Sequence, residues 1–462
     1  MKQARFFLGL FCIGSTATLI PDKLFAVDAP PRVLTRLIFQ DDDAKTLKWA
    51  DLLAGEPPQL GPITAVAGFP QLDKEHQSLV QMEAASGVIL VGVRDDDDGQ
   101  FQSGWVLIDT GVEANEHGDH AHWSAPRTPI VRAQVRDTQQ GNPAHLYVYD
   151  GMFYLANDQK NGFTRFDPNG INPKDDAAII RKRAAFHAGG GGHITLAAIG
   201  NSVAYSSWID REGTNKGRVD VTPLSASGTS KARYSFQLPH GGIHGAVANQ
   251  GKVFFAPSDG ICWVNADPSL QADPKMIAVQ QLSLGKDGDR PRRTGAFTTF
   301  GKHVAFVAGA GPKAEVGFMD ASAKEIKLNR LTVPMAEGNL PAGLEIVQPR
   351  KGPLLALVFH DHTPDVDAPY RLSLLEVDPN RNGNWTDAKI GTELDVGRAR
   401  VDGHAGHHSV AFDADRRRAI FSNPGDGTLT VLDLESRKVV TEFRVSGVPS
   451  KLIAQGGRDS GH

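Results

Sequence analysis

The sequence has 462 residues, of which 40% are hydrophobic and 22% are charged; this composition is that of a globular protein and excludes a collagenous or disordered chain. Its 49 basic and 53 acidic residues give a formal net charge of −4, so there is no basic excess of the kind that nucleic-acid binding requires. The length predicts either about three ordinary domains or one large all-β domain built from repeats.

The first 26 residues have the features of a secretory signal peptide. Lys2 and Arg5 precede an apolar run at positions 6–20, and a small residue, alanine, ends the segment. The apolar run is shorter than the roughly 20 residues that cross a membrane. We therefore expect a secreted mature chain of residues 27–462 that is not inserted in a membrane. We also expect it to be a monomer.

A short pattern then recurs eight times along the mature chain: an apolar strand that ends in Asp or Asn and is followed by a turn. The repeated residue returns at intervals of 45 to 58 residues, a spacing typical of a unit of three or four strands. Helical periodicity is nearly absent. The eight marker residues are Asp51, Asp109, Asp167, Asp220, Asn265, Asp320, Asp378 and Asp433.

Four-stranded sheets repeated around an axis predict a β-propeller, an all-β fold that leaves only short, protected sheet edges. Eight markers predict eight blades in one domain of residues 27–462; insertions at 76–136 and 342–391 leave seven blades as the alternative. Residues 450–454 resemble the first strand of a further unit, whereas residues 32–51 lack one. We therefore expect the C-terminal strand to complete the first blade and close the ring.

One cysteine, Cys262, remains after removal of the signal peptide, so an internal disulfide is excluded. Cys262 lies in an apolar, strand-like run at 261–264. This position predicts a buried small hydrophobic side chain rather than a reactive thiol.

Five of the eight predicted inner strands open with a histidine. Because the first strand of each blade lines the axis of a propeller, we expect the opening residues to converge at one end of it. The histidines would then form part of a ring of imidazoles, with a purely structural role in holding blades together as the alternative. The eight openings are His76, His145, His193, His244, Thr294, Ala342, His408 and Lys451.

A second histidine cluster, residues 116–122, follows the second marker in a predicted loop and begins with Glu116 and His117. His120 and His122 are two residues apart, so in an extended segment they point the same way and can hold one cation. Asp119 would bond one of the imidazole nitrogens. One or two histidines from the ring would complete a tetrahedral site, whose nitrogen ligands suit Zn²⁺ and, as the alternative, Cu²⁺.

Two other groups of histidines are candidates. His404, His407 and His408 precede the last complete blade, and of these we favour His408 as a metal ligand and leave the other two undecided. His360 and His362 lie in an insertion, where a solvated loop is favoured over a second metal site. The sequence has neither a glycine-rich phosphate loop nor a serine elbow.

The sequence resembles the AztD family of secreted zinc metallochaperones. The signal peptide, the propeller repeats, the strand end at Asp109 leading into residues 116–122, and the opening at His408 carry the resemblance. It implies a periplasmic propeller that binds Zn²⁺ and delivers it to the solute-binding protein of a zinc ABC importer, and is not an enzyme. The ligands that it supports are His117, Asp119, His120, His122 and, more weakly, His408.

One feature departs from this family. Members can carry a histidine-rich arm directly after the signal peptide, but residues 27–32 contain no histidine. Zinc transfer would then need another route, such as a surface site around His360 and His362. Two other functions stay open: a propeller metalloenzyme in which a histidine-bound metal activates water, and a metal-free interaction scaffold.

Overall fold

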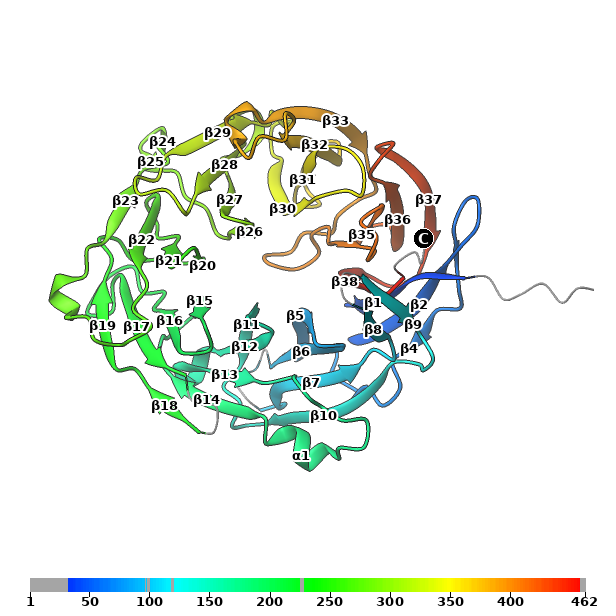
Figure 1. Cartoon of the computed structure of the whole chain (residues 1–462), viewed down its shortest axis with the longest axis horizontal. Helices are drawn as coiled ribbons and strands as arrows, with labels where there is room; N and C mark the ends of the chain where they lie inside the picture. The colour runs from blue at the N-terminus through cyan, green and yellow to red at the C-terminus, as the bar shows by residue number, and fades with distance from the viewer. Residues whose placement is uncertain (1–31, 96, 98–99, 118–119, 225–227, 458–462) are drawn as a thin grey trace, which may run out of the picture.

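A computed structural model describes residues 32–457 except 96, 98–99, 118–119 and 225–227. In this part of the chain, eight sheets of at least four strands surround a common axis (Figure 1). The prediction of an eight-bladed all-β propeller is therefore confirmed, and the seven-bladed alternative is wrong. The predicted signal peptide, residues 1–26, lies outside the described residues.

Each blade runs from an inner strand near the axis to an outer strand at the rim. In this order, the first blade contains β38 (Pro449–Gln455), β1 (Val33–Asp41), β2 (Thr46–Leu53) and β3 (Gln59–Leu60), the second β5 (Gln77–Ala85), β6 (Val88–Asp95), β7 (Ser103–Asp109) and β10 (Ile130–Asp137), and the third β11 (Pro143–Tyr149), β12 (Met152–Asn157), β13 (Gly162–Phe166) and β14 (Ala184–Ala188). The fourth blade contains β15 (Leu196–Ile199), β16 (Val203–Ser207), β17 (Arg218–Pro223) and β19 (Tyr234–Gln237), the fifth β20 (Ala246–Asn249), β21 (Lys252–Phe255), β22 (Ile261–Asn265) and β23 (Gln280–Leu282), and the sixth β26 (Thr298–Phe300), β27 (His303–Ala308), β28 (Glu315–Asp320) and β29 (Leu328–Thr332). The seventh blade contains β30 (Leu340–Val347), β31 (Leu354–Asp361), β32 (Arg371–Asp378) and β33 (Lys389–Asp395), and the eighth β34 (Val410–Phe412), β35 (Arg418–Asn423), β36 (Thr428–Asp433) and β37 (Lys438–Arg444).

A few short elements supplement the blades. β4 (Thr64–Ala65) pairs with β2, and β18 (Ser230–Lys231) pairs in parallel with β14. Two hairpins stand apart from the blades: β8 (Glu113–His117) with β9 (His120–Ser124), and β24 (Lys286–Asp287) with β25 (Arg290–Pro291). Among the described residues the α-helix is α1 (Ala177–Arg181), and no helix is long and apolar enough to span a membrane.

The C-terminal strand closes the ring as predicted. β38 pairs antiparallel with β1, so that Ile453 lies opposite Ile38 and Leu452 lies opposite Phe39. The first blade is thus built from both ends of the described chain. Because β38 covers the axial edge of β1, that edge of the first blade is not left unpaired.

The eight markers of the sequence repeat occupy one equivalent place in the structure: each lies in, or directly after, the third strand of its blade. The carboxylates of five of them accept backbone hydrogen bonds in the turn that follows: Asp109, Asp167, Asp320, Asp378 and Asp433. Asp320 accepts a hydrogen bond from the backbone N–H of Ser322 at 2.9 Å, and Asp433 accepts one from that of Ser436 at 2.7 Å. An acidic residue at the start of a tight turn is favoured for this reason, which explains why the repeat is visible in the sequence.

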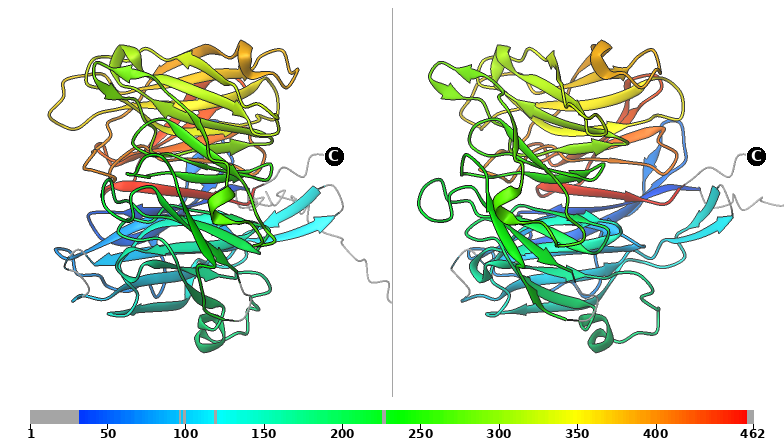
Figure 2. Two further views of the ribbon diagram at one scale, coloured as in Figure 1. Left: turned by 90° about the vertical axis from the view of Figure 1, so that its left-hand side faces the viewer. Right: turned by 60° about the vertical axis from the view of Figure 1, so that its left-hand side comes forward.

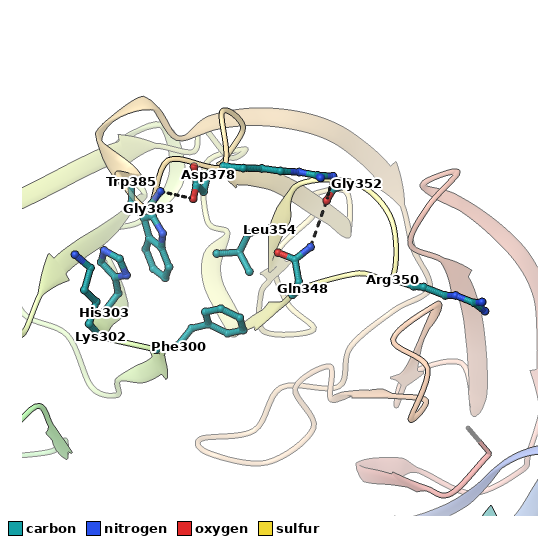
Figure 3. A pocket seen from close by; sticks show the side chains of 12 residues that line it. Phe300, Lys302, His303, Gln348, Arg350, Gly352, Leu354, Asp378, Gly383 and Trp385 are labelled. Atoms are coloured by element: carbon teal, nitrogen blue, oxygen red, sulfur yellow. Dashed lines mark hydrogen bonds between the residues drawn. The ribbon is translucent and has the colours of Figure 1, made fainter. Parts of the chain in front are cut away.

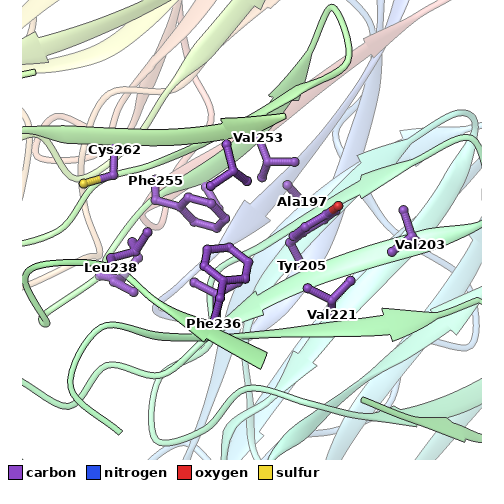
Figure 4. Packing of buried hydrophobic residues seen from close by; sticks show 13 residues of the cluster. Ala197, Val203, Tyr205, Val221, Phe236, Leu238, Val253, Phe255 and Cys262 are labelled. Carbon is purple, nitrogen blue, oxygen red and sulfur yellow. The ribbon is translucent and has the colours of Figure 1, made fainter. Parts of the chain in front are cut away.

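The hydrophobic core lies between neighbouring blades. In the cluster of Figure 4, Phe236 of the fourth blade meets Phe255 of the fifth edge to face, with ring centroids 6.2 Å apart at 71°. Cys262 is fully buried in the same cluster, and burial raises the pKa of its thiol to about 12. The predicted role of Cys262 as a small core residue is confirmed.

The alternation of strand direction gives the propeller two distinct faces. On the first, which we call the opening face, the inner strands begin and the second strands end. On the other, which we call the hairpin face, the third strands end and the outer strands begin. The β8–β9 hairpin connects β7, a third strand, to β10, an outer strand, and Figure 2 shows it projecting beyond the body of the propeller.

Candidate metal centre

Three histidines meet at the opening face. His145, His193 and His244 come from the inner strands of three successive blades, or from the residues just before them, and each offers one ligand atom within 4.8 Å of the others. The ring centroids of His145 and His193 are 4.4 Å apart, and those of His193 and His244 are 5.1 Å apart. Among the described residues this is the one group of three or more His, Cys, Asp or Glu side chains with such a spacing. We call it the histidine triad.

A β-bulge positions His145. The pairing of β11 with β12 is regular from Leu146 onward but shifts between Pro143 and Leu146. A bulge redirects the side chains near it, and His145 lies within the shifted segment. Its ring turns toward the next blade, where Nδ1 lies 3.0 Å from the backbone oxygen of Ile194.

A run of four glycines, 189–192, leads into His193. Gly190 and Gly192 have φ values of 78° and 75°, a conformation that favours glycine. At Gly191, an added Cβ would lie 2.3 Å from the indole ring of Trp208. The glycines therefore let the backbone pack directly on the adjoining blade and bring His193 to the axis, where its Nδ1 lies 3.1 Å from Oδ2 of Asp158.

His244 is fixed by its own backbone. Its N–H donates to the oxygen of Ala256 at 2.9 Å, and the N–H of Ala256 donates back to Gly245 at 2.8 Å. Nδ1 of the ring lies 3.3 Å from the oxygen of Gly295. The next blade thus orients this imidazole as well.

The partners of the triad determine which ring nitrogen is available. In all three histidines Nδ1 faces an acceptor oxygen, so in the neutral imidazole the hydrogen sits on Nδ1 and Nε2 carries a lone pair. Nε2 of His193 is buried without a hydrogen-bond partner. A histidine oriented through one nitrogen by a carboxylate or a carbonyl is the usual arrangement of a metal ligand, and Asp158 has this role toward His193.

Burial keeps two members of the triad in their neutral form. It lowers the pKa of His145 to about 3, and the neighbouring His193 and His244 contribute to the same shift. Burial is also the largest cause of the lowered pKa of His244. His145 and His244 are therefore neutral at pH 7 and can bind a cation without first losing a proton.

The spacing of the triad suits a small tetrahedral ion. Nitrogens bound to Zn²⁺ at about 2.0–2.1 Å lie roughly 3.3 Å from one another, compared with the upper limit of 4.8 Å among the ligand atoms here. The ligand atoms would therefore have to approach one another by at most about 1.5 Å when the ion binds. Three nitrogens leave one tetrahedral position for a further ligand.

Two of the five predicted ring histidines lie elsewhere. The ring of His76 stacks on Phe101 with centroids 4.1 Å apart, and its Nδ1 bonds Asp73 at 2.9 Å. His408 is buried: its Nδ1 contacts Asp361 and its Nε2 lies 2.9 Å from the oxygen of Gly397. Both nitrogens of His408 are therefore engaged with acceptors, and the structure gives it a structural contact where the sequence predicted a ligand.

The histidines of the 116–122 cluster do not join the triad. His117 and His120 are paired across the β8–β9 hairpin, and His122 lies opposite Asn115; Asp119 falls outside the described residues. Because the hairpin follows a third strand, it belongs to the hairpin face, whereas the triad belongs to the opening face. The prediction of a single metal site that combines both groups of histidines is therefore wrong, because the hairpin and the triad lie at opposite ends of the propeller axis.

The two histidines of the insertion also have protein partners. Nε2 of His360 lies 2.8 Å from the hydroxyl of Ser373. His362 contacts the backbone oxygens of Thr363 and Ala368, both at 2.9 Å, and stacks on Tyr370. His360 and His362 are buried, so the favoured interpretation as a solvated loop is wrong, and their side chains serve the packing of the seventh blade.

Sequence reasoning missed Asp158 and left His404 undecided. Asp158 directly follows the buried strand β12, and this position after an apolar run is the signal that could have identified it. The ring of His404 lies 5.1 Å from that of His244 and 6.0 Å from that of His193. It reaches the triad from a distant loop, which no sequence spacing indicates.

The hairpin face carries a separate cavity of about 420 Å³ between the sixth and seventh blades (Figure 3). His303 stacks on Trp385 at its wall, with ring centroids 3.7 Å apart. Burial lowers the pKa of His303. Polar and apolar side chains are mixed in this cavity, and it is remote from the histidine triad because it opens where the second strands begin.

Comparison with known proteins identifies relatives by fold. No protein-family model matches the sequence, and no curated protein sequence matches it. The structure is similar to that of AztD from Citrobacter koseri, with a TM-score of 0.62 and 16% identity over 93% of this chain and 100% of that chain. The apo form of Citrobacter koseri AztD gives a TM-score of 0.62 and 15% identity over 92% and 99% of the two chains. The chain is thus an eight-bladed propeller that resembles AztD in fold over nearly its whole length.

Proposed function

We propose that this protein is a periplasmic zinc carrier that holds Zn²⁺ at the histidine triad and delivers it to the solute-binding protein of a zinc ABC importer. The observation that carries the proposal is the orientation of the triad: three imidazoles, each with Nδ1 facing an acceptor oxygen, gathered on one axis. Export by the N-terminal signal peptide and a monomeric state belong to the same proposal.

The donor set supports a carrier in preference to a scaffold. Buried polar atoms normally have partners, yet Nε2 of His193 has none among the described residues. A bound cation would satisfy this atom. If the histidines served only to hold the blades together, each ring nitrogen near the axis would be expected to bond a neighbouring blade.

Competition with a chromogenic chelator at pH 7 tests zinc binding. The mature chain, residues 27–462, should bind one Zn²⁺ at the triad, and the double substitution His145→Ala, His193→Ala should abolish this binding. His76→Ala is the matched control, because it removes a histidine from the equivalent strand opening of another blade. Equal zinc affinity in the double variant and the control would rule out the triad as the site.

Delivery needs its own experiment. Zinc-loaded protein is mixed with an apo zinc-binding solute-binding protein, the two are separated, and the metal in each is measured. Faster transfer than through free zinc in solution, determined with a chelator present, supports a direct handover. Transfer at the rate of simple dissociation would leave the protein as a zinc-binding protein without a carrier role.

A metalloenzyme is the second candidate, since three imidazoles and one open position also activate water. Cobalt substitution distinguishes the two candidates, because the visible spectrum of bound Co²⁺ depends on whether a water or a fourth protein ligand completes the site. A fourth protein ligand favours the carrier. Titration with Cu²⁺, which imidazole sites bind more tightly by intrinsic preference, determines how strongly the site selects zinc.

A further inference from the structure

A long loop brings a fourth histidine to the triad. Residues 396–409 connect β33, the outer strand of the seventh blade, to β34, the inner strand of the eighth. Figure 1 shows the orange segment before β35 extending toward the centre of the ring. His404 lies on this loop, and its ring is nearly parallel to that of His244, at 23°, and to that of His193, at 16°.

The tip of the loop is a small, self-contained turn. The N–H of Arg400 donates to the oxygen of Gly406 at 2.8 Å, and Asp402 and Ala405 exchange two backbone hydrogen bonds of 3.1 and 2.9 Å. Gly403 has a φ of 58°, which suits the turn. These backbone hydrogen bonds are internal to the tip, while the guanidinium of Arg400 pairs with Asp43 of the first blade at 3.1 Å. We call residues 400–406 the loop tip.

The base of the loop, by contrast, is firmly held. Asp361, at the end of β31, accepts hydrogen bonds from the ring of His407 at 2.9 Å and from the backbone N–H of His408 at 3.2 Å, and it pairs with the ring of His408. Asp361 and His408 are buried. The loop therefore has a fixed hinge point at His407, while His404 at the tip is exposed.

The contacts of His404 are confined to the metal centre. Among the described residues its ring contacts are with His193 and His244, and its side chain makes no hydrogen bond. The imidazole of His404 is thus presented at the edge of the triad, with its ring centroid 5.1 Å from that of His244 and 6.0 Å from that of His193.

We infer that His404 is the fourth ligand of the zinc site and that the loop tip is the element whose movement releases the ion. This inference rests on the proposed function, because it assumes that the triad binds zinc. Three ligands come from blades fixed by sheet pairing, and the fourth comes from a turn tethered at its ends. Ligand exchange with a partner therefore begins at His404, since displacing it breaks no strand pairing within a blade and opposes only the exposed ion pair of Arg400 with Asp43.

Two measurements on His404→Ala test the inference. Changing a side chain that merely orients a zinc ligand lowers metal affinity about 10- to 100-fold, so loss of a ligand should lower zinc affinity at least about tenfold. The rate of zinc release to excess chelator, followed by stopped flow, should rise by a similar factor. Asp402→Ala is the matched control, because it removes an exposed side chain from the same loop tip and leaves the backbone bonds in place.

The outcomes separate this inference from the proposed function. If the wild-type protein binds no zinc, the proposed function fails, and the inference fails with it. If the wild type binds zinc but His404→Ala matches Asp402→Ala in affinity or in release rate, the inference alone is wrong. Thermal unfolding of each metal-free variant checks the fold, and His404→Gln, which keeps a polar side chain of similar length but no imidazole, should reproduce the loss.

Discussion

The carboxylate of Asp361 and the imidazole of His408 form a fully buried pair, with Oδ1 of Asp361 2.5 Å from Nδ1 of His408. Nε2 of His408 faces the oxygen of Gly397. Both ring nitrogens thus face acceptors, so both contacts are hydrogen bonds only when the imidazole carries two hydrogens and a positive charge. This pair joins the seventh blade to the base of the His404 loop, and the charges of His408 and His407 hold the pKa of Asp361 well below its usual range.

Loss of the carboxylate should therefore destabilise the protein strongly. Asp361→Ala leaves the buried ring of His408 and two further donors without their acceptor, and removal of one partner of a buried pair costs about 3–5 kcal/mol. Chemical denaturation of the metal-free protein measures the loss in the free energy of unfolding. Asp365→Ala, an exposed acidic residue of the following turn, is the control. Equal stability of the two variants would contradict the structural role of the pair.

Zinc should stabilise the wild-type fold through the triad. A ligand that binds only the folded state at 100 times its dissociation constant adds about 2.7 kcal/mol to the free energy of unfolding. The melting temperature should therefore rise with added Zn²⁺ and fall again with EDTA. His145→Ala combined with His193→Ala should remove this dependence, and an unchanged zinc-induced shift in that variant would place the ion elsewhere.

The histidines of the β8–β9 hairpin should contribute nothing to the triad site. The hairpin follows a third strand, so it emerges at the hairpin face. Replacement of His117, His120 and His122 by alanine should leave the affinity of the tightest zinc site unchanged within about twofold, while any weaker second site is lost. A large drop in the tightest affinity, measured by chelator competition, would show that the hairpin histidines hold that ion.

The C-terminal strand should be essential for a cooperative fold. Removing residues 449–462 deletes β38, the inner strand of the first blade, and exposes the edge of β1 along its pairing with Leu452 and Ile453. We expect a broad thermal transition at a temperature at least about 10 °C lower, together with aggregation at the exposed edge. A chain ending at Gln455 retains β38 and should unfold like the full protein. A sharp, unshifted transition without β38 would show that ring closure is dispensable.

Two glutamates near the axis should make stability depend on pH. Burial raises the pKa of Glu83 and of Glu345 to about 7, Lys451 opposes both shifts, and Glu83 adds to the shift of Glu345. Glu345 is exposed and Glu83 is half-buried, so contact with water reduces the effect of these shifts on stability. A folded pKa above the unfolded value of 4.5 gives stability that is full below about pH 4.5 and is lost as the pH rises through about 7.

Glu83→Gln combined with Glu345→Gln tests this pH dependence. Because glutamine does not ionise, the double variant should gain in melting temperature relative to wild type as the pH rises from about 4.5 to about 7, and the gain should level off above pH 7. The difference between the two proteins, followed by thermal unfolding at constant ionic strength, is the relevant quantity. A difference that stays constant over this range would show that neither carboxyl group titrates near pH 7.

The sequence by itself determined the eightfold repeat and the closure of the ring. The repeat is visible because five of the eight markers are acidic residues that accept backbone hydrogen bonds in the turn after the third strand, and this is local chemistry. The strand opening at Lys451 was recognisable for a similar reason, since an inner strand without a blade of its own has to pair with the first blade.

Only the tertiary structure decided which histidines meet. All five histidine openings precede inner strands, as the sequence predicted, but His76 turns to Phe101 and His408 to Asp361. The residues that contact His76 and His408 come from other strands and loops, and no local sequence pattern predicts where those strands and loops lie. The strand direction also sends the 116–122 cluster to the far face, and a loop between two distant blades supplies His404. Side-chain convergence depends on the three-dimensional path of the whole chain, whereas the repeat depends only on residues within each unit.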